Sequence, residues 1–383
     1  MKLTALILLL ISAFSAFALE CDLKSQAVLG NEVLKELSSS PLSCKPNSIH
    51  VTFDDGPSPS VTPHILNELQ LRNIKASFFI TTSNLAPEHA KYKENRDLVL
   101  KTMNAGHLIA NHGHNHDAYC LRMNGKGEIL DEGFTQTERE EQIKKSKELL
   151  QWSTAGRYNQ QKPLLFRFPY GRGAMPSEME LQRMVSDGEI KLKPGTYSEQ
   201  LAEYRHLSPP LQTLAGSNLS HLGWNHDSGD SSFGIKAPEN KVIKDYILKN
   251  LRGLCSNPQI TKVALFHDIK EMNISAIPVI LDIGKCLGLK FISAQEMAKD
   301  KNLNKTGVLI EKQDILIGMV KSGFSTLEET KDLTPKQCVN DIDKSCFSEQ
   351  YKKRYPHCSG GDSVCFEGKW LSRTDPIIIN NCH

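Results

Sequence analysis

Short apolar runs alternate with helical segments over the first three quarters of the chain, and this alternation limits the possible folds. Seven stretches have the length and residue types of strands, namely residues 48–53, 74–81, 107–112, 163–171, 220–228, 262–268 and 290–293. Helical spacing of apolar residues lies between several of them, at 61–72, 96–106 and 135–152. Such alternation is typical of parallel βα units. We therefore expect an α/β fold, with about seven parallel strands in a distorted (β/α) barrel.

The character of the chain changes near residue 303. Five of the ten cysteines follow residue 337, and the βα alternation ends before them. A length of 383 residues is enough for one large domain and one small one. We expect a main domain over 19–303 and a small cysteine-rich accessory region over 304–383. Residues 117–134 and 189–218 are predicted to be long loops.

The N-terminus has the pattern of a secretory signal peptide. Residues 1–18 contain an early lysine, an apolar run and a small–x–small end at Ala16–Phe17–Ala18, which predicts cleavage after Ala18. The apolar run falls short of the ~20 residues that a membrane span needs. We expect export to the periplasm or the exterior. The net charge of +2 and the lack of a basic run give no sign of nucleic acid binding.

All ten cysteines follow the predicted cleavage site. An oxidising compartment permits disulfides, but sequence alone does not give their connectivity. At least one of the five cysteines after residue 337 must pair outside that region or stay free. Cys255 and Cys286 are the nearest candidates for such a partner.

Polar and aromatic residues stand where five of the predicted strands end. In parallel βα barrels the carboxyl ends of the strands share one rim, where active sites lie. Stability alone does not explain so many charged residues at this one position. The residues concerned are Asp54 and Asp55, His112, Arg167 to Tyr170, Asp227 and Asp230, and His267 and Asp268.

The stretch HGHNH holds two histidines four residues apart. On a helical turn His112 and His116 would share a face, so two imidazoles could converge on one metal ion. Taken alone, the motif favours a solvated histidine-rich turn over a metal site. His114, between the two, is a candidate for a hydrogen bond that shapes the loop or for an extra ligand. No glutamate lies inside the motif, which excludes an HExxH site.

The stretches TFDDGP, HGHNH, RFPYG, DSGD and LFHD, in this order, resemble the five motifs of the NodB-like polysaccharide deacetylases, carbohydrate esterase family four. The resemblance covers roughly residues 48–296, and the first, second, third and fifth motifs match closely. Two positions depart from the pattern. Gly113 replaces the usual Ser or Thr, and Ser231 replaces the usual Trp.

The resemblance implies a metal centre and an acid–base pair. The metal ligands would be Asp55, His112 and His116. The family most often uses Zn²⁺, and this donor set does not exclude Co²⁺ or Ni²⁺. Asp54 would be the base that takes a proton from the attacking water, and His267 the acid that protonates the leaving amine.

The remaining roles implied by the resemblance concern orientation and substrate binding. Arg167 would orient the base, and the backbone N–H of Tyr170 would stabilise the oxyanion. Either Asp227 or Asp230 would hold His267 or brace Arg167. The walls of the acetyl pocket would be Leu265, Trp224 and Pro169.

The expected activity is removal of N-acetyl groups from N-acetylglucosamine in an exported bacterial-type polysaccharide. Peptidoglycan is the first choice of substrate, followed by chitin oligomers or poly-N-acetylglucosamine, and then by acetylxylan. The alternative is a non-catalytic glycan-binding relative, which would typically lack the base or a metal ligand. The accessory region would be a disulfide-held cap or a wall-binding module. The sequence does not indicate an oligomeric state.

Overall fold

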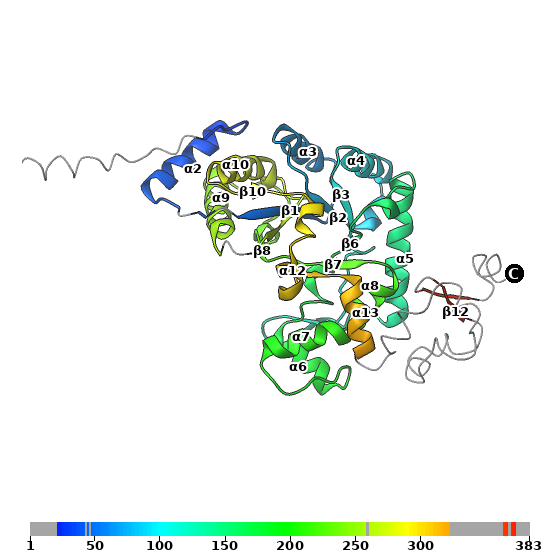
Figure 1. Ribbon diagram of the computed structural model, residues 1–383. Coiled ribbons are helices and arrows are strands. Elements are labelled where there is room, and N and C mark those ends of the chain that lie inside the picture. Colours follow the sequence, from blue (N-terminus) through cyan, green and yellow to red (C-terminus); the bar gives the residue numbers. More distant parts are fainter. Residues whose placement is uncertain are drawn as a thin grey trace, which may run out of the picture. The chain divides into compact units, whose positions relative to one another are not determined.

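The computed structural model describes residues 21–42, 44–45, 47–257, 260–321, 363–366 and 369–372 (Figure 1). The predicted signal peptide lies outside these residues. Within the described part of the chain, no helix is both long and apolar enough to cross a membrane. The chain divides into two compact units, which are described one after the other.

Nine strands are hydrogen-bonded in the order β11-β7-β6-β3-β2-β1-β9-β8, with β10 beside β1. Most of the pairs are parallel, and the antiparallel exception is β11 on β7. The predicted α/β class with a mostly parallel sheet is therefore confirmed. The strands are β1 (Ser48–Asp54), β2 (Ser77–Ile80), β3 (Leu108–Asn111), β6 (Leu165–Phe166), β7 (Ser220–Leu222), β8 (His226–Asp227), β9 (Lys262–His267), β10 (Lys290–Phe291) and β11 (Leu309–Ile310).

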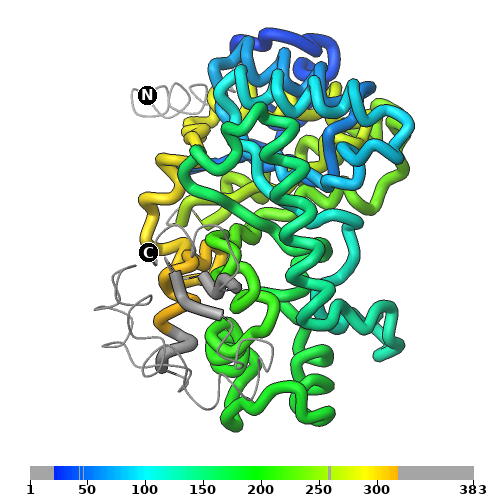
Figure 2. The backbone as a smooth tube through the Cα atoms, turned by 90° about the vertical axis from the view of Figure 1, so that its right-hand side faces the viewer, coloured from blue at the N-terminus to red at the C-terminus, as the bar shows by residue number. Residues whose placement is uncertain are grey.

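The first unit comprises Met1–Ile80, Pro87–Ile109 and Trp224–Asn302. Segments distant in the sequence lie side by side in it, as the blue and yellow-green traces of Figure 2 show. Strand β1 is buried along nearly its whole length, as parallel strands covered by helices are. The helices of this unit are α2 (Ala27–Ser39), α3 (Thr62–Leu71), α4 (Tyr92–Asn104), α9 (Asn240–Cys255), α10 (Met272–Cys286) and α11 (Ala294–Met297), with the 3-10 turn η4 (Asp230–Ser232).

The second unit comprises Thr81–Ala86, Ala110–Gly223 and Leu303–His383. An aromatic cluster forms part of its core, where the Tyr119 ring packs edge-on against Phe166 and Phe168. The helical elements that belong to this unit are α5 (Gln136–Ser153), α6 (Glu178–Ser186), α7 (Tyr197–Leu207), α8 (Pro209–Gly216), α13 (Lys312–Lys321), η1 (Thr82–Leu85), η2 (Tyr158–Gln160) and η3 (Pro169–Gly171). Helix α12 (Lys301–Thr306) begins in the first unit and ends in this one.

The prediction of long loops at 117–134 and 189–218 is wrong in part. Residues 117–134 contain an antiparallel hairpin of β4 (Arg122–Met123) and β5 (Ile129–Asp131). Residues 189–218 contain α7 and α8. The strands of the hairpin are too short to show a period. The sequence signal of helix α7 is a capping box at Thr196 and Glu199, and not a regular apolar stripe.

The sheet continues beyond residue 303, where β11 pairs with β7 and Ile315 of α13 joins the buried cluster of this unit. Further on, β12 (Ser363–Phe366) and β13 (Lys369–Ser372) form an antiparallel pair. The predicted boundary at 303 stays a prediction. Most of the predicted accessory region lies outside the described residues.

Two disulfides attach the N-terminal segment to the helices of the first unit. Cys21 is bonded to Cys286 and Cys44 to Cys255. The idea that Cys255 or Cys286 pairs with the C-terminal region is therefore wrong, because earlier cysteines already occupy both. Within the described ranges, Cys120 is a free thiol. Helix α2 lies between the two attached cysteines and buries Val33 and Leu37.

Candidate active site

The two adjacent aspartates occupy different backbone conformations at the end of β1. Asp54 is the last residue of the strand, is buried, and stands in register with His267 of β9. Asp55 follows with φ 72°, in the left-handed region. This turn breaks the alternation of the strand. The two carboxylates are therefore free to take different roles, as the sequence analysis predicts.

Gly56 is required because a buried carboxyl group lies against it. A Cβ atom at this position would overlap the Oδ1 atom of Asp268. The other oxygen of Asp268 accepts a hydrogen bond of 2.5 Å from Thr62 Oγ1, in the first turn of α3. Burial raises the pKa of Asp268 to about 7, although the bond from Thr62 opposes this. Asp268 thus fixes the turn of Asp55 against α3, a role that sequence reasoning missed although LFHD contains the residue.

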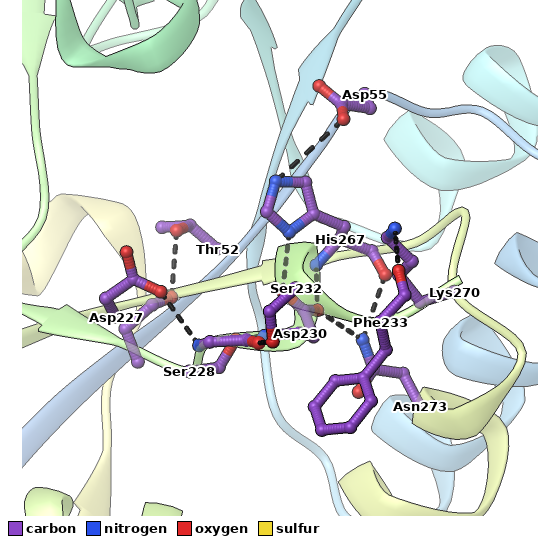
Figure 3. Close-up of polar contacts among 12 residues, drawn as sticks. Thr52, Asp55, Asp227, Ser228, Asp230, Ser232, Phe233, His267, Lys270 and Asn273 are labelled. Carbon is purple, nitrogen blue, oxygen red and sulfur yellow. Dashed lines mark hydrogen bonds and ion pairs between the residues drawn. The ribbon is translucent and has the colours of Figure 1, made fainter. Parts of the chain in front are cut away.

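His267 lies between two carboxylates (Figure 3). Its Nδ1 is 2.6 Å from Asp230 Oδ1, and its Nε2 is 3.8 Å from Asp55 Oδ2. Burial lowers the pKa of His267, but the hydrogen bond and charge of Asp230 outweigh this, and with Asp55 and Asp54 they raise it to about 9. A carboxylate partner that stabilises the protonated imidazole suits a general acid.

Asp230 is itself fixed by donors from two directions. Its Oδ2 accepts from the backbone N–H of His267 at 2.8 Å and from Asn273 Nδ2 at 2.7 Å. Asn273 was not predicted, because an asparagine in the first turn of a helix carries no sequence signal for this function. Asp227, the alternative partner, is exposed and accepts instead from the backbone N–H of Gly229 at 2.8 Å.

The histidines of HGHNH are brought together by turns and not by a helix. Gly113 has φ 82° and His116 has φ 61°, so the expected helical turn is wrong. The rings of His112 and His116 nevertheless lie edge to face, with centroids 5.0 Å apart. His112 Nδ1 is 2.8 Å from the carbonyl oxygen of Arg167. Because a carbonyl only accepts, Nδ1 carries the proton and Nε2 keeps its lone pair for a metal.

His114 takes a different position from its two neighbours. It is buried, and its Nδ1 is 3.1 Å from Thr82 Oγ1. The backbone reinforces this contact, since the N–H of Ser83 donates to the carbonyl of His114. His114 therefore anchors the loop to η1, and it is absent from the group of side chains that could hold a metal ion.

Arg167 is fully buried and fixed by backbone carbonyls. Its Nε donates to Leu222 O and its Nη2 to Gly223 O, both at 2.9 Å. Its own carbonyl orients His112, so one residue links the third motif to the second. The predicted pairing with Asp54 stays a prediction.

Tyr170 stands in the turn η3 with φ 59° and an exposed fraction of 45%. Its ring packs edge to face on His116, with centroids 4.8 Å apart. Asp55, His116 and Tyr170 are thus all non-glycine residues in the left-handed region. Such conformations cost about 1–3 kcal/mol each and gather at functional sites.

The three residues predicted to line the acetyl pocket are placed as follows. Leu265 is buried on β9, in register with Thr52. Trp224 is half-buried just before β8, and Pro169 is buried at the start of η3. Their contact with an acetyl group stays a prediction.

Three of the predicted ligands meet the first requirement of a metal site. The ligand atoms of Asp55, His112 and His116 all lie within 4.8 Å of one another. One carboxylate and two imidazoles suit Zn²⁺ and leave coordination positions for water and substrate. The residues therefore fit a divalent ion, and the donor set does not identify which one.

Residues 43–191 match the family model described as polysaccharide deacetylase.

Two relatives illustrate the extent of the match. A peptidoglycan-N-acetylglucosamine deacetylase of Listeria monocytogenes is 40% identical over 68 residues, which are 18% of this chain and 13% of that protein. One from Bacillus cereus is 25% identical over 258 residues, covering 66% of this chain and 89% of that protein. Among solved structures, a polysaccharide deacetylase from Bacillus cereus superposes with a TM-score of 0.44 at 24% identity, covering 64% of this chain and 91% of that one.

Proposed function

We propose that this protein is a metal-dependent hydrolase that removes N-acetyl groups from N-acetylglucosamine residues of an exported polysaccharide, with peptidoglycan as the substrate. The observation that carries the proposal is the position of His267. An imidazole held by Asp230 at 2.6 Å stands 3.8 Å from Asp55, a carboxylate of the candidate metal group. An acid so close to a metal carboxylate is the arrangement that amide hydrolysis needs.

The side chains divide the proton transfers between them. When bound, a divalent ion lowers the pKa of water from 15.7 to about 7 and polarises the acetyl carbonyl. Asp54 accepts the proton of the attacking water, and Arg167 keeps the base oriented. The N–H of Tyr170 donates to the oxygen of the acetyl group as negative charge develops there. His267 gives its proton to the nitrogen as the C–N bond breaks, which releases acetate and an amine.

Peptidoglycan is proposed because the matching proteins of Listeria and Bacillus cereus carry that name. Export is proposed because the two disulfides are of the kind that persists in an oxidising compartment. Zn²⁺ is proposed as the ion, since a carboxylate with two imidazoles is a common zinc donor set.

The decisive experiment measures acetate release from peptidoglycan, chitin oligomers and acetylxylan, with and without a chelator. We expect chelator-sensitive release that is fastest from peptidoglycan, and mass spectrometry of the products would show which sugar loses its acetyl group. A preference for chitin oligomers would correct the substrate. Absence of chelator-sensitive release from all three would refute the enzymatic function.

Asp54→Asn provides the matched test of the base. It should keep the metal and lose turnover, because the amide cannot accept a proton from water. An Asp54→Asn variant with wild-type turnover would contradict the assigned role.

A further inference from the structure

The hairpin of β4 and β5 places an arginine beside the candidate metal site. The guanidinium carbon of Arg122, on β4, lies 4.1 Å from the centre of the Tyr170 ring. The Tyr170 ring in turn packs on His116, one of the predicted metal ligands. One aromatic ring therefore separates Arg122 from a metal-binding imidazole.

The charge of Arg122 has no protein counter-ion among the described residues. None of the ion pairs that the structure resolves in the described ranges involves this side chain, and its Nε is buried without an acceptor. A buried N–H without a partner is costly unless a ligand supplies the acceptor. The Nε atom of Arg122 therefore has hydrogen-bonding capacity that the described residues do not satisfy.

Acidic side chains on the neighbouring elements are already engaged elsewhere. Asp131 stands opposite Arg122 in the hairpin, but its two oxygens accept from the N–H groups of Ala118 and Gly133. Glu180 of α6 accepts from the N–H of Met123 and pairs with Arg172 at 3.0 Å. These bonds hold the hairpin in place, and neither carboxylate forms an ion pair with Arg122.

The Tyr170 ring explains how such a site would be preorganised. A guanidinium that stacks on an aromatic face is held in a fixed plane, and its N–H groups at the edge remain available. Guanidinium groups bind carboxylates in this way through two parallel hydrogen bonds. Less side-chain entropy is then lost when the anion binds.

We propose that Arg122 is a specificity-determining residue that binds a carboxylate of the glycan next to the reacting sugar. The stem peptides of peptidoglycan carry such carboxylates, whereas chitin oligomers are neutral. This inference rests on the proposed function and deepens it, because it predicts a preference for an acidic glycan over a neutral one of the same N-acetylated sugar.

The test uses soluble peptidoglycan fragments that carry intact stem peptides. They are compared with the same fragments after the carboxylates have been converted to amides. Binding is measured by calorimetry in the Asp54→Asn background, so that turnover does not change the ligand. Arg122→Gln should weaken binding of the carboxylate form on the order of tenfold, as expected for a charge-assisted hydrogen bond. The loss for the amidated form should be much smaller. The difference should also shrink at high salt.

Two further variants serve as controls. Lys126→Gln removes the same charge from the exposed tip of the same hairpin and should leave both affinities unchanged. Arg122→Lys keeps the charge without the planar fork and should give an intermediate affinity for the carboxylate form.

The outcomes separate this inference from the proposed function. If Arg122→Gln weakens both forms equally, or neither, Arg122 is not a carboxylate site. If the wild type releases no acetate from any glycan, the proposed function fails, but the binding comparison still decides the role of Arg122.

Discussion

His267 and His112 are both predicted site residues, and the partners of their imidazoles differ. His267, in the first unit, has its Nδ1 against the carboxylate of Asp230. His112, in the second unit, has its Nδ1 against the backbone carbonyl of Arg167. A carboxylate stabilises the protonated ring and so favours an acid. A neutral carbonyl fixes the tautomer without adding charge and so favours a metal ligand.

The comparison teaches that the partner of a histidine, and not its place at the end of a strand, decides its chemistry. His107 extends the lesson. Its Nδ1 accepts from the backbone N–H of Ala76 at 3.1 Å, so it must be unprotonated there. The ring is buried and packs edge-on against Phe78.

The strongest way to break the comparison is to truncate the two site histidines separately. His112→Ala should lose the bound metal and reduce acetate release below detection. His267→Ala should retain the metal and lower acetate release by about 10²–10⁴-fold, the usual contribution of a general acid. Metal content by atomic emission and acetate by enzymatic assay would check both. Equal metal loss in the two variants would contradict the division of roles.

The partner of the acid can be tested on the same loop. Asp230→Asn should lower acetate release on the order of 10–100-fold, because the amide neither charges the imidazole nor accepts all three hydrogen bonds. Asp227→Asn is the matched control. Its carboxylate only accepts from a turn N–H, so activity should stay within about twofold. A larger loss of acetate release in Asp227→Asn than in Asp230→Asn would show that Asp230 is not the functional partner of His267.

Adding a methyl group at Gly56 tests how tightly the turn after Asp55 is packed. Gly56→Ala should cost about 2–3 kcal/mol of unfolding free energy, because the new Cβ would overlap the buried carboxyl group of Asp268. Metal affinity should fall with it. Gly216→Ala, where a Cβ meets nothing within 4 Å, should not destabilise the protein. Chemical denaturation of the two variants measures the difference, and equal stabilities would show that the turn adapts.

The smallest expected effect is that of the buried His107 on the pH dependence of stability. Burial lowers the pKa of His107 to about 4, with Lys75 adding to the shift. Since the unfolded state takes up a proton near pH 6.5, this contribution to stability is complete above that pH and is lost as the pH falls toward 4. The titration of His107 should thus lower the unfolding free energy by about 2 kcal/mol between pH 7 and pH 5. His107→Asn should flatten the pH dependence of the unfolding free energy by that amount, and an unchanged slope would contradict it.

Much of the fold was predictable, because strands buried on both faces and amphipathic helices leave strong periodic signals. All seven predicted strand segments contain a strand, and 220–228 contains two. The hairpin of β4 and β5 and the helix α7 were missed, because short strands and a polar helix have no clear period. The hairpin carries Arg122.

The sequence predicted the three side chains that lie close enough to hold a metal ion, but not the geometry that brings them together. Motif order singled out His112 and His116, yet the helical turn expected between them is replaced by left-handed residues that spacing does not reveal. The sequence also left Asp227 and Asp230 equivalent. Only the fold shows that Asp230 is buried against His267 while Asp227 turns outward. Asn273 and Asp268 act through contacts between distant segments, which no local pattern encodes.

The two disulfides also constrain how the molecule can be made. Cys21 precedes its partner by 265 residues and Cys44 precedes its partner by 211. In a chain that emerges from its N-terminus, both thiols are exposed long before Cys255 and Cys286 appear, and each could bond wrongly to the other. Correct pairing must therefore follow the arrival of α9 and α10. Biogenesis depends on keeping the early cysteines reduced, or on exchanging their first bonds, until most of the chain has been delivered.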